Sequence, residues 1–510
     1  MTITLSRPIR INGTEISGVQ SLSADMEADL IARGSALPLD LAPGVSRPYA
    51  NHAAEHEGLN LVAMLSYAPV LHLSSYPRRG TETDDGPRLH RALSAVPEGG
   101  ALYLGGLSEV ITVRTAEGFV DRCVNLTGYS DRGLFGQATI RIADDVPVGR
   151  TLMRGTFHRT NFYGFTLDGN VDGRFPGAGV EIYGAESEGY NLKQCTQVNA
   201  YYLTAKNMHQ DGFDTDGCID CLLYRCRAID NWGEGYHLTG EGGAHDNYCW
   251  NCMAVECYSE NNGHMRRASG DPYGNGYSTS GSGNYIVNCK SVGDARGIYV
   301  GAVECKIFGN TIIDPGTEDG LTGEAGIIIK EPARGALIEG NTVVNASALT
   351  GSVGIKAEAP NNIIKGNYVK NAVSGIWIAA NNTTASNNTV NTATNGVLVD
   401  GNTDWSYARD NTLLSCQYGV RTNSAKVSIK GNIIKSPSSH AIELRAGEAN
   451  VTGNEVYGGF GWGVRGFDST VNTCIIKDNI LNAASGGISM HVSSTGHVQK
   501  DNVVNGAHVP

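Results

Sequence analysis

The chain has 510 residues and a formal net charge of −12, with 66 glycines and 12 cysteines. This length allows a large core or several domains. The acidic balance argues against nucleic acid as a partner, and no apolar run is long enough for insertion into a membrane. The first 20 residues lack the apolar core of a signal peptide.

Residues 1–75 do not share the repeat that fills the rest of the chain. We therefore predict two parts, an N-terminal arm or attachment module (1–75) and a repeat domain (76–510). At the start of the second part, Asp84 or Asp85 can cap a short helix with Pro87 in its first turn. This amphipathic helix is expected to cover the open edge of the first repeat.

A short strand of the form Gly-apolar-x-apolar recurs from residue 212 to residue 490, mostly at intervals in the low twenties. A second column, Asn followed by a short apolar strand, runs in phase with it from Asn310 to Asn502. Such a period predicts stacked supersecondary units. Asparagine suits the tight turns, and its amide can bond to the same turn one coil away. The pattern predicts an all-β fold, a parallel β-helix.

Nine of the twelve cysteines lie between Cys195 and Cys305. The pairs Cys218/Cys221 and Cys249/Cys252 have the spacing of a zinc ribbon. The repeat offers another explanation, because it aligns Cys226, Cys252 and Cys289 with the Asn column and Cys249 with Leu223, Ile286 and Ile307. Cysteine buries well as a small apolar residue. We therefore expect core thiols, with no bound metal and no cofactor.

Thr83-Asp-Asp, the short helix and the Gly99-Gly strand resemble the opening of pectate-lyase-like, single-stranded right-handed β-helix proteins. The resemblance covers about residues 76–505 and is typical of the branch that includes phage tailspike depolymerases. It implies a right-handed helix, a homotrimer and cleavage of a bacterial surface polysaccharide. It also implies a virion tail protein that acts outside the cell and attaches to a tail or baseplate protein through its N-terminus. A secreted enzyme is the alternative.

The third residue of each Gly-apolar-x-apolar strand is expected to point outward. This places Glu181, Asp214 and His237 in one outward column, while Asp211 and Glu234 precede the glycines in another. Paired carboxylates suit glycoside hydrolysis. We predict Asp211, Asp214, Glu234 and His237 as catalytic, with retaining and inverting geometry both open. The segment His209–Asp214 also resembles the Asn-Thr-Asp-Gly-x-Asp motif of polygalacturonases, which implies an acidic catalytic role for Asp211; the aspartate pair of the next coil in that family is replaced by Glu234-Gly235.

The longest interval of the repeat, between Gly235 and Gly276, holds many ionisable and aromatic residues. Site-bearing loops on a rigid scaffold are often such insertions. We expect substrate to contact Glu181, Trp232, Glu260, His264, Arg266, Arg267, Asp271, Tyr273, Tyr277 and Tyr299.

Two other function classes use the same groove. A lyase or uronate epimerase would use His264, Arg266, Tyr273 and Tyr277, with calcium held by Asp211, Asp214 and Glu181. A non-enzymatic adhesin would stack sugars on Trp232, Trp250 and Trp377.

Overall fold

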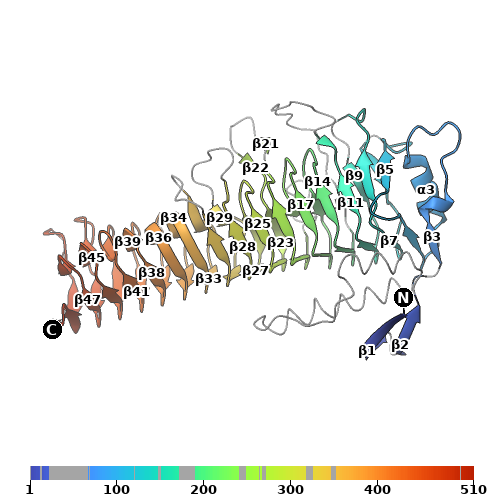
Figure 1. Ribbon diagram of the computed structural model, residues 1–510. Helices are drawn as coiled ribbons and strands as arrows, with labels where there is room; N and C mark the ends of the chain where they lie inside the picture. Colours follow the sequence, from blue (N-terminus) through green and yellow to red (C-terminus); the bar gives the residue numbers. More distant parts are fainter. Residues whose placement is uncertain are drawn as a thin grey trace.

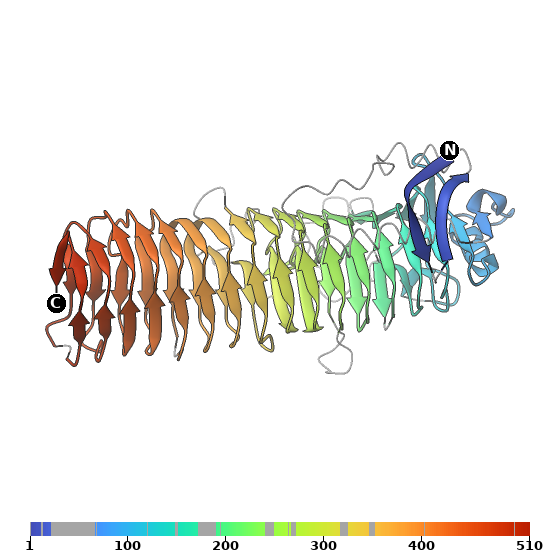
Figure 2. The ribbon, with the colours of Figure 1, turned by 90° about the horizontal axis from the view of Figure 1, so that it is seen from below.

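The computed structural model describes residues 2–11, 14–21, 67, 69–119, 121–147, 151–171, 190–193, 195–239, 249–263, 265–266, 272–316, 325–345, 352–401, 403–493 and 495–509. Short strands stack into an elongated rod, with the N-terminal coils at one end and the C-terminus at the other (Figures 1 and 2). Each coil contributes three short strands to three parallel ladders, as the repeat predicts.

In the first ladder, each strand pairs in parallel with its counterpart one coil away. Its strands are β3 (Val70–His72), β4 (Ala101–Tyr103), β7 (Gly133–Phe135), β10 (Asn161–Tyr163), β13 (Asn199–Tyr201), β16 (Leu222–Tyr224), β19 (Met253–Val255), β24 (Tyr285–Val287), β27 (Lys306–Phe308), β30 (Leu337–Glu339), β33 (Ile363–Lys365), β35 (Thr384–Ser386), β37 (Tyr407–Arg409), β40 (Val427–Lys430), β43 (Ala449–Thr452), β46 (Ile475–Lys477) and β49 (Val498–Lys500).

The second ladder contains the strands that follow the Asn column. They are β5 (Val110–Val113), β8 (Thr139–Ile142), β11 (Thr166–Asp168), β14 (Thr204–Lys206), β17 (Arg227–Ile229), β20 (Tyr258–Glu260), β25 (Lys290–Val292), β28 (Thr311–Ile313), β31 (Thr342–Val344), β38 (Thr412–Leu414), β41 (Ile433–Lys435), β44 (Glu455–Tyr457), β47 (Ile480–Asn482) and β50 (Asn502–Val504). A last strand, β51 (Ala507–Val509), pairs with β50 in antiparallel fashion.

The third ladder contains the Gly-apolar-x-apolar strands. They are β6 (Arg122–Asn125), β9 (Thr151–Gly155), β12 (Tyr190–Lys193), β15 (Phe213–Asp216), β18 (Tyr236–Leu238), β23 (Tyr277–Ser282), β26 (Ile298–Val303), β29 (Ala325–Ile329), β32 (Val353–Ala357), β39 (Tyr418–Thr422), β42 (Ile442–Leu444), β45 (Trp462–Gly466) and β48 (Gly486–Ser489). Two long strands, β34 (Tyr368–Ile378) and β36 (Thr389–Val399), run through both the second and the third ladder.

The Asn column forms a continuous ladder of buried side chains. From Asn310 to Asn502, each Nδ2 donates to the Oδ1 of the next asparagine at 2.9–3.0 Å. The same Oδ1 also accepts the backbone N–H of the preceding asparagine, for example Asn411 to Asn432 at 3.1 Å. Buried polar groups need such partners. The predicted bond between neighbouring coils is confirmed.

The first coil is covered by the helix α3 (Gly86–Ala95) and preceded by a 3-10 turn, η1 (Leu73–Ser75). Leu89 and Leu93 of α3 are buried, which confirms the capping role. The Asp84 carboxylate accepts the Gly86 N–H at 2.7 Å. Asp85 occupies the N-cap position without a side-chain cap bond, because its carboxylate pairs with Arg78 and accepts the Thr112 N–H.

All twelve cysteine side chains are buried free thiols, so the expected core-filling role is confirmed. The predicted alignment is confirmed for Cys226 and Cys289 but was wrong for Cys252 and Cys249. Cys289 precedes Asn310 in the Asn column, and Cys257 precedes Cys289. Cys252 instead lies over Asn284, and Ala254, not Cys249, shares the position of Leu223 and Ile286. Two columns of small residues recur about five residues apart, so the spacing alone did not distinguish them.

Most of residues 1–75, the N-terminal module, lies outside the described residues. At its start, β1 (Thr2–Ile11) and β2 (Thr14–Ser21) form an antiparallel pair. At its end, β3 and η1 already belong to the rod, since β3 pairs with β4. Among the described residues, no helix is both long and apolar enough to cross a membrane.

Candidate active site

The outward column of the third ladder forms one side of the candidate site. Asp214, His237, Ser278 and Tyr299 are register neighbours on β15, β18, β23 and β26. The sequence predicted this column, but it placed Glu181 beside Asp214. The neighbouring strand is β12, and its residue in register is Asn191. Glu181 itself lies outside the described residues.

An aromatic stack in the core supports these strands from behind. The rings of Phe213 and Tyr236 are stacked with centroids 5.0 Å apart, and those of Tyr236 and Tyr277 are 4.7 Å apart. Successive side chains of a strand point to opposite faces of the sheet. The stacked rings on the inner face therefore keep the neighbouring residues on the outer face aligned from one rung to the next. Tyr277 was predicted to bind substrate, and this is wrong: its side chain is fully buried.

The second column consists of the residues before the glycines, Asp211, Glu234 and Asn275. Asp211 Oδ1 accepts the backbone N–H of Glu234 at 2.5 Å. Glu234 in turn accepts the Asn275 Nδ2 on Oε1 at 2.6 Å and the Ser278 hydroxyl on Oε2. Gly233 permits the close approach, since a Cβ there would meet Asp211 Oδ1 at 2.4 Å. The Glu234 carboxylate is thereby held by donors from the next coil.

His237 lies between the carboxylates. Its Nδ1 is 3.1 Å from Asp214 Oδ1 and 3.8 Å from Asp211 Oδ2, and its Nε2 is 3.9 Å from Glu234 Oε2. The Thr239 hydroxyl lies 2.7 Å from the same Nε2. The four residues predicted as catalytic therefore form one cluster, called here the carboxylate–histidine cluster (Asp211, Asp214, Glu234 and His237).

The electrostatics of the cluster favour bound protons. Burial raises the pKa of Asp211 well above its ordinary value, and the charges of Glu234 and Asp214 add to this effect, against the opposing charge of His237. Burial by itself would lower the pKa of His237, but Glu234, Asp214 and Asp211 outweigh it and hold that pKa well above 6.5. His237 is therefore held in its protonated form, and Asp211 binds a proton more readily than an ordinary aspartate does.

Accessibility differs sharply within the cluster. The Asp211 side chain is buried, and its Oδ2 has no hydrogen-bond partner among the described residues. Asp214 and Glu234 are also nearly buried, whereas 24% of the His237 side chain is exposed. The cluster therefore meets solvent mainly at His237. One ligand atom each from Asp211, Asp214 and His237 lies within 4.8 Å of the others, so these three could also hold a cation.

The remaining predicted binding residues are dispersed. Tyr299 lies on the outward column two rungs from His237. Trp232 lies two residues before Glu234, with its ring 5.3 Å from that of His209. Glu260 is in β20, on the second ladder. The backbone of Arg266 and Tyr273 belongs to the antiparallel pair β21 (Met265–Arg266) and β22 (Pro272–Tyr273). Outside the described residues lie His264, Arg267 and Asp271.

Sequence reasoning missed three residues that hold the cluster: Asn275, Ser278 and Thr239. A signal for two of them was present. Asn275 continues the column of Asp211 and Glu234 before the repeat glycines, and Ser278 follows His237 in the outward column. The repeat aligned both positions, but neither residue was singled out for the site.

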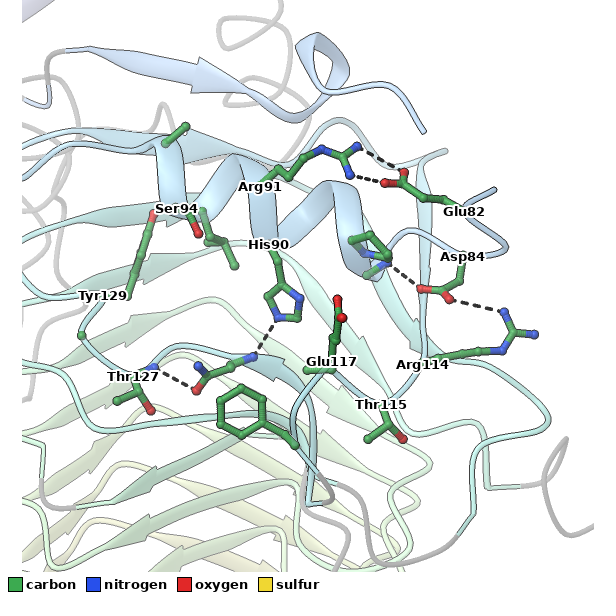
Figure 3. A pocket seen from close by; sticks show the side chains of 18 of the residues that line it. Glu82, Asp84, His90, Arg91, Ser94, Arg114, Thr115, Glu117, Thr127 and Tyr129 are labelled. Atoms are coloured by element: carbon green, nitrogen blue, oxygen red, sulfur yellow. Dashed lines mark hydrogen bonds and ion pairs between the residues drawn. The ribbon is translucent and has the colours of Figure 1, made fainter. Parts of the chain in front are cut away.

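A separate cavity of about 980 Å³ lies at the N-terminal end of the rod, beneath α3 (Figure 3). Figure 3 shows an ion pair between Arg91 and Glu82 at its rim and Asp84 between α3 and Arg114. Inside it, His90 Nε2 accepts the backbone N–H of Asn125 at 3.1 Å. These side chains attach α3 to the first coils. The strand β6, which carries Asn125, is three rungs away from β15 of the candidate active site. The cavity and the carboxylate–histidine cluster are thus distinct.

Comparisons with known proteins agree with this architecture. A family model described as "Right handed beta helix region" matches residues 374–509. A comparison with curated protein sequences gave no match. Among solved structures, the tailspike protein of E. coli bacteriophage HK620 in complex with pentasaccharide is similar, with a TM-score of 0.54 and 10% identity over 86% of this chain and 79% of that chain.

Mutants of the same tailspike are similar as well. A glutamate-to-alanine mutant in complex with pentasaccharide has a TM-score of 0.56 and 10% identity over 87% of this chain and 80% of that chain. A double mutant, aspartate to alanine and glutamate to glutamine, has a TM-score of 0.54 and 10% identity over 86% and 79%. With the parallel coils described above, these likenesses identify the chain as a right-handed parallel β-helix protein.

Proposed function

We propose that the chain is a polysaccharide depolymerase that cleaves a bacterial surface glycan by glycoside hydrolysis at the carboxylate–histidine cluster. The observation that carries this proposal is the arrangement of the cluster, in which a partly exposed histidine and a buried aspartate lie beside a glutamate that two donors orient. Both Asp211 and His237 have raised pKa values. Glycosyl transfer needs a group that holds a proton next to a carboxylate that acts as base or nucleophile.

The geometry supports a role for each residue. Glu234, fixed by Asn275 and Ser278, is the carboxylate that activates water or attacks the sugar. His237 is the exposed end of the proton-holding pair, and the buried Asp211 lies 3.8 Å behind it. Asp214 orients His237 through Nδ1. Hydrogen bonds in unliganded sites are often long and tighten only when substrate binds.

The similar structures support glycan as the substrate class. The HK620 tailspike was solved with a pentasaccharide, and its mutants replace an aspartate or a glutamate, the residue types that this cluster offers. On this proposal the protein works on a virion tail outside the bacterial cell. Residues 1–75 would then attach it to a tail or baseplate protein.

The test is mass spectrometry of products from a panel of capsules, O-antigens and plant polyuronates. Wild-type protein should shorten at least one of them. Glu234→Gln keeps the shape of the side chain and removes its charge. It should lower turnover by roughly 10³-fold or more, while glycan binding and melting temperature change little, because the lost group acts in the transition state. Asp211→Asn and Asp214→Asn should also reduce turnover.

Asp230→Asn is the matched control. Asp230 is exposed and lies on the same coil, four residues before Glu234, and its left-handed backbone (φ 53°) tolerates asparagine. It should retain full activity. Cleavage that survives all three cluster substitutions would place catalysis elsewhere on the rod and contradict the proposal.

A lyase or epimerase is the second candidate, because Asp211, Asp214 and His237 could hold a cation. A cation there would compete with the proton on His237, since a metal ligand must be deprotonated. Loss of activity in a chelator, restored by calcium, together with products that absorb ultraviolet light at an unsaturated uronic end, would favour the lyase. Retained activity in the chelator with saturated products would favour hydrolysis.

A further inference from the structure

A basic and aromatic patch lies far from the candidate active site, toward the C-terminal end of the same ladder. Beyond Trp377, the outward column continues through Leu398 and Arg421 to Glu443 and Arg465, which are register neighbours on β36, β39, β42 and β45 (Figure 1). Arg445 and Phe467 follow directly after β42 and β45. We call Arg421, Arg445, Arg465, Glu443 and Phe467 the arginine patch.

Charge in the arginine patch is not balanced. Glu443 is its one carboxylate, with 1% of its side chain exposed; it accepts Arg445 Nε at 2.6 Å and lies 3.4 Å from Arg421 Nε. Arg465 has a different neighbour, with Nη1 2.6 Å from His440 Nε2. Burial and the charge of Arg465 lower the pKa of His440, so this imidazole adds no positive charge. Two guanidinium groups therefore share one carboxylate, and a third has no carboxylate among its contacts in the described part of the chain, whose net charge over the full sequence is −12.

Aromatic rings pack against the guanidinium groups of the patch and restrict their orientation. Arg445 and Arg465 lie over the Phe467 ring, at 4.5 and 4.8 Å from its centroid, and Arg421 lies 5.1 Å from that of Tyr418. Phe467 is itself 38% exposed. A planar guanidinium that is already ordered loses little entropy when it binds a carboxylate or phosphate in bidentate fashion. An exposed ring beside it offers an apolar face to a sugar.

We propose that the arginine patch is a second glycan-binding site, specific for saccharides that carry carboxylate or phosphate groups. It shares the outward column with the candidate active site, seven rungs from His237, which corresponds to about 34 Å at ~4.8 Å per rung. Between the two, the column contains Tyr299, the buried Ile328, Lys356 and Trp377. Lys356 Nζ lies 4.3 Å from the Trp377 ring centroid and pairs with Glu358. One long acidic chain can follow this column and be held at its distal end. Binding at the patch requires no chemistry at His237, so this inference stands apart from the proposed cleavage.

The test is calorimetric binding to the full chain. The acidic probes are oligogalacturonate, oligomannuronate and hyaluronan oligosaccharides, and the neutral probes are malto-oligosaccharides of the same length. At least one acidic probe should bind, more weakly as salt increases, and the neutral ones should not. Arg465→Gln and Phe467→Ala should each raise its Kd about tenfold or more, equivalent to about 1.4 kcal/mol. The matched control is Arg409→Gln, at an exposed arginine of β37 on the first ladder, and it should leave Kd unchanged.

Several outcomes would overturn the inference: no acidic probe binds, neutral probes bind equally well, or the patch variants bind as wild type does. A patch variant that alters the molar mass in light scattering, with probe binding unchanged, would assign the patch to contacts with a second copy of the chain. Arg465→Lys keeps the positive charge but removes the planar guanidinium. It should weaken probe binding less than Arg465→Gln does. Glu234→Gln should leave probe binding intact, so failure of cleavage and failure of binding are distinguishable.

Discussion

At the scale of single residues, the carboxylate–histidine cluster depends on one exposed imidazole among three nearly buried carboxylates. Burial and repulsion raise the pKa of Asp211, while attraction to the same carboxylates keeps His237 protonated. The two effects oppose each other in part, because the positive charge of His237 lowers the pKa of Asp211, and a proton on Asp211 removes one of the charges that raise the pKa of His237. Such perturbed groups gathered on one surface are typical of functional sites.

The titration of His237 gives a prediction on stability. Its pKa is raised in the folded state, so its contribution is fully present below about pH 6.5 and is lost as pH rises through the folded pKa. Wild type should therefore melt at a higher temperature than His237→Gln near pH 6.5, and the difference should shrink as pH rises through the folded pKa. Calorimetric melting curves check this, with His72→Gln on β3 as control. A difference that grows with pH would contradict it.

At the scale of elements, the ladders are held in register by buried polar columns, and one of these contains an acid. Asn231 and Asn262 continue into Asp294, which takes the place of an asparagine. Asp294 accepts the Ser291 hydroxyl at 2.6 Å and the Asn262 N–H at 2.8 Å. Burial nevertheless raises its pKa to about 6, because these hydrogen bonds only partly offset the desolvation of the charge.

Replacing this acid should stabilise the protein at neutral pH. A raised carboxyl pKa means that the folded state binds the proton more tightly, so stability falls as pH rises from 3.8 to about 6 and is constant above that. Asp294→Asn should melt at a higher temperature than wild type at pH 7 and show no gain at pH 4. The control is Asp220→Asn, at an exposed residue. A gain that is equal at both pH values would show that charge is not the cause.

The Asn ladder should be sensitive to deletion of one member. Asn411→Ala removes the acceptor of Asn388 N and Nδ2, both at 3.0 Å, and the donor to Ala385 O. Each buried group left unpaired costs about 1–3 kcal/mol. Denaturant unfolding should therefore show a clear loss of stability, centred by hydrogen exchange on the neighbouring coils, because repeats couple mainly to their neighbours. Asn450→Ala, on the exposed side of β43, should be nearly neutral.

At the scale of the whole molecule, the first ladder stacks seventeen strands from β3 to β49 within the described part of the chain. At ~4.8 Å per spacing, this gives a rod of about 77 Å. One outward column of that ladder carries exposed apolar residues, since Ile363, Tyr407, Ile475 and Val498 are 36–53% exposed. Polar residues alternate with them in the register: Thr384, Ser428 and Asn450. A row of this kind along a rigid surface is suited to packing against a second copy of the chain.

We predict that three copies pack side by side along this column, as the resemblance to tailspikes implies. Light scattering should then give about three times the chain mass of 54.0 kDa. Tyr407→Glu combined with Ile363→Glu should lower that mass, since charges would be buried without partners. Ile480→Glu, at an exposed residue of the second ladder, should not. A wild-type monomer at micromolar concentration, with full activity, would contradict this prediction.

The sequence by itself determined the fold and the rungs of the candidate site. The period of Gly-apolar-x-apolar placed Asp214, His237 and Ser278 in one outward column, because a residue's position within a repeated strand decides both its face and its neighbours. The same reasoning predicted the Asn ladder. This reasoning failed at Cys252, because two similar columns of small residues lie close together. It also failed at Glu181, because the repeat was counted across an insertion.

Only the tertiary structure decided which side chains meet and how buried they are. The period placed Ser278 beside His237 and Asn275 in the column of Glu234, but only the packing of the two coils shows that both donate to the Glu234 carboxylate. The burial of Asp211 and Tyr277, which decides whether a group can touch substrate, results from packing of neighbouring coils. The arginine patch likewise brings together Arg421, Arg445 and Arg465 from three successive coils, and their shared neighbours Glu443 and Phe467 follow from rung stacking.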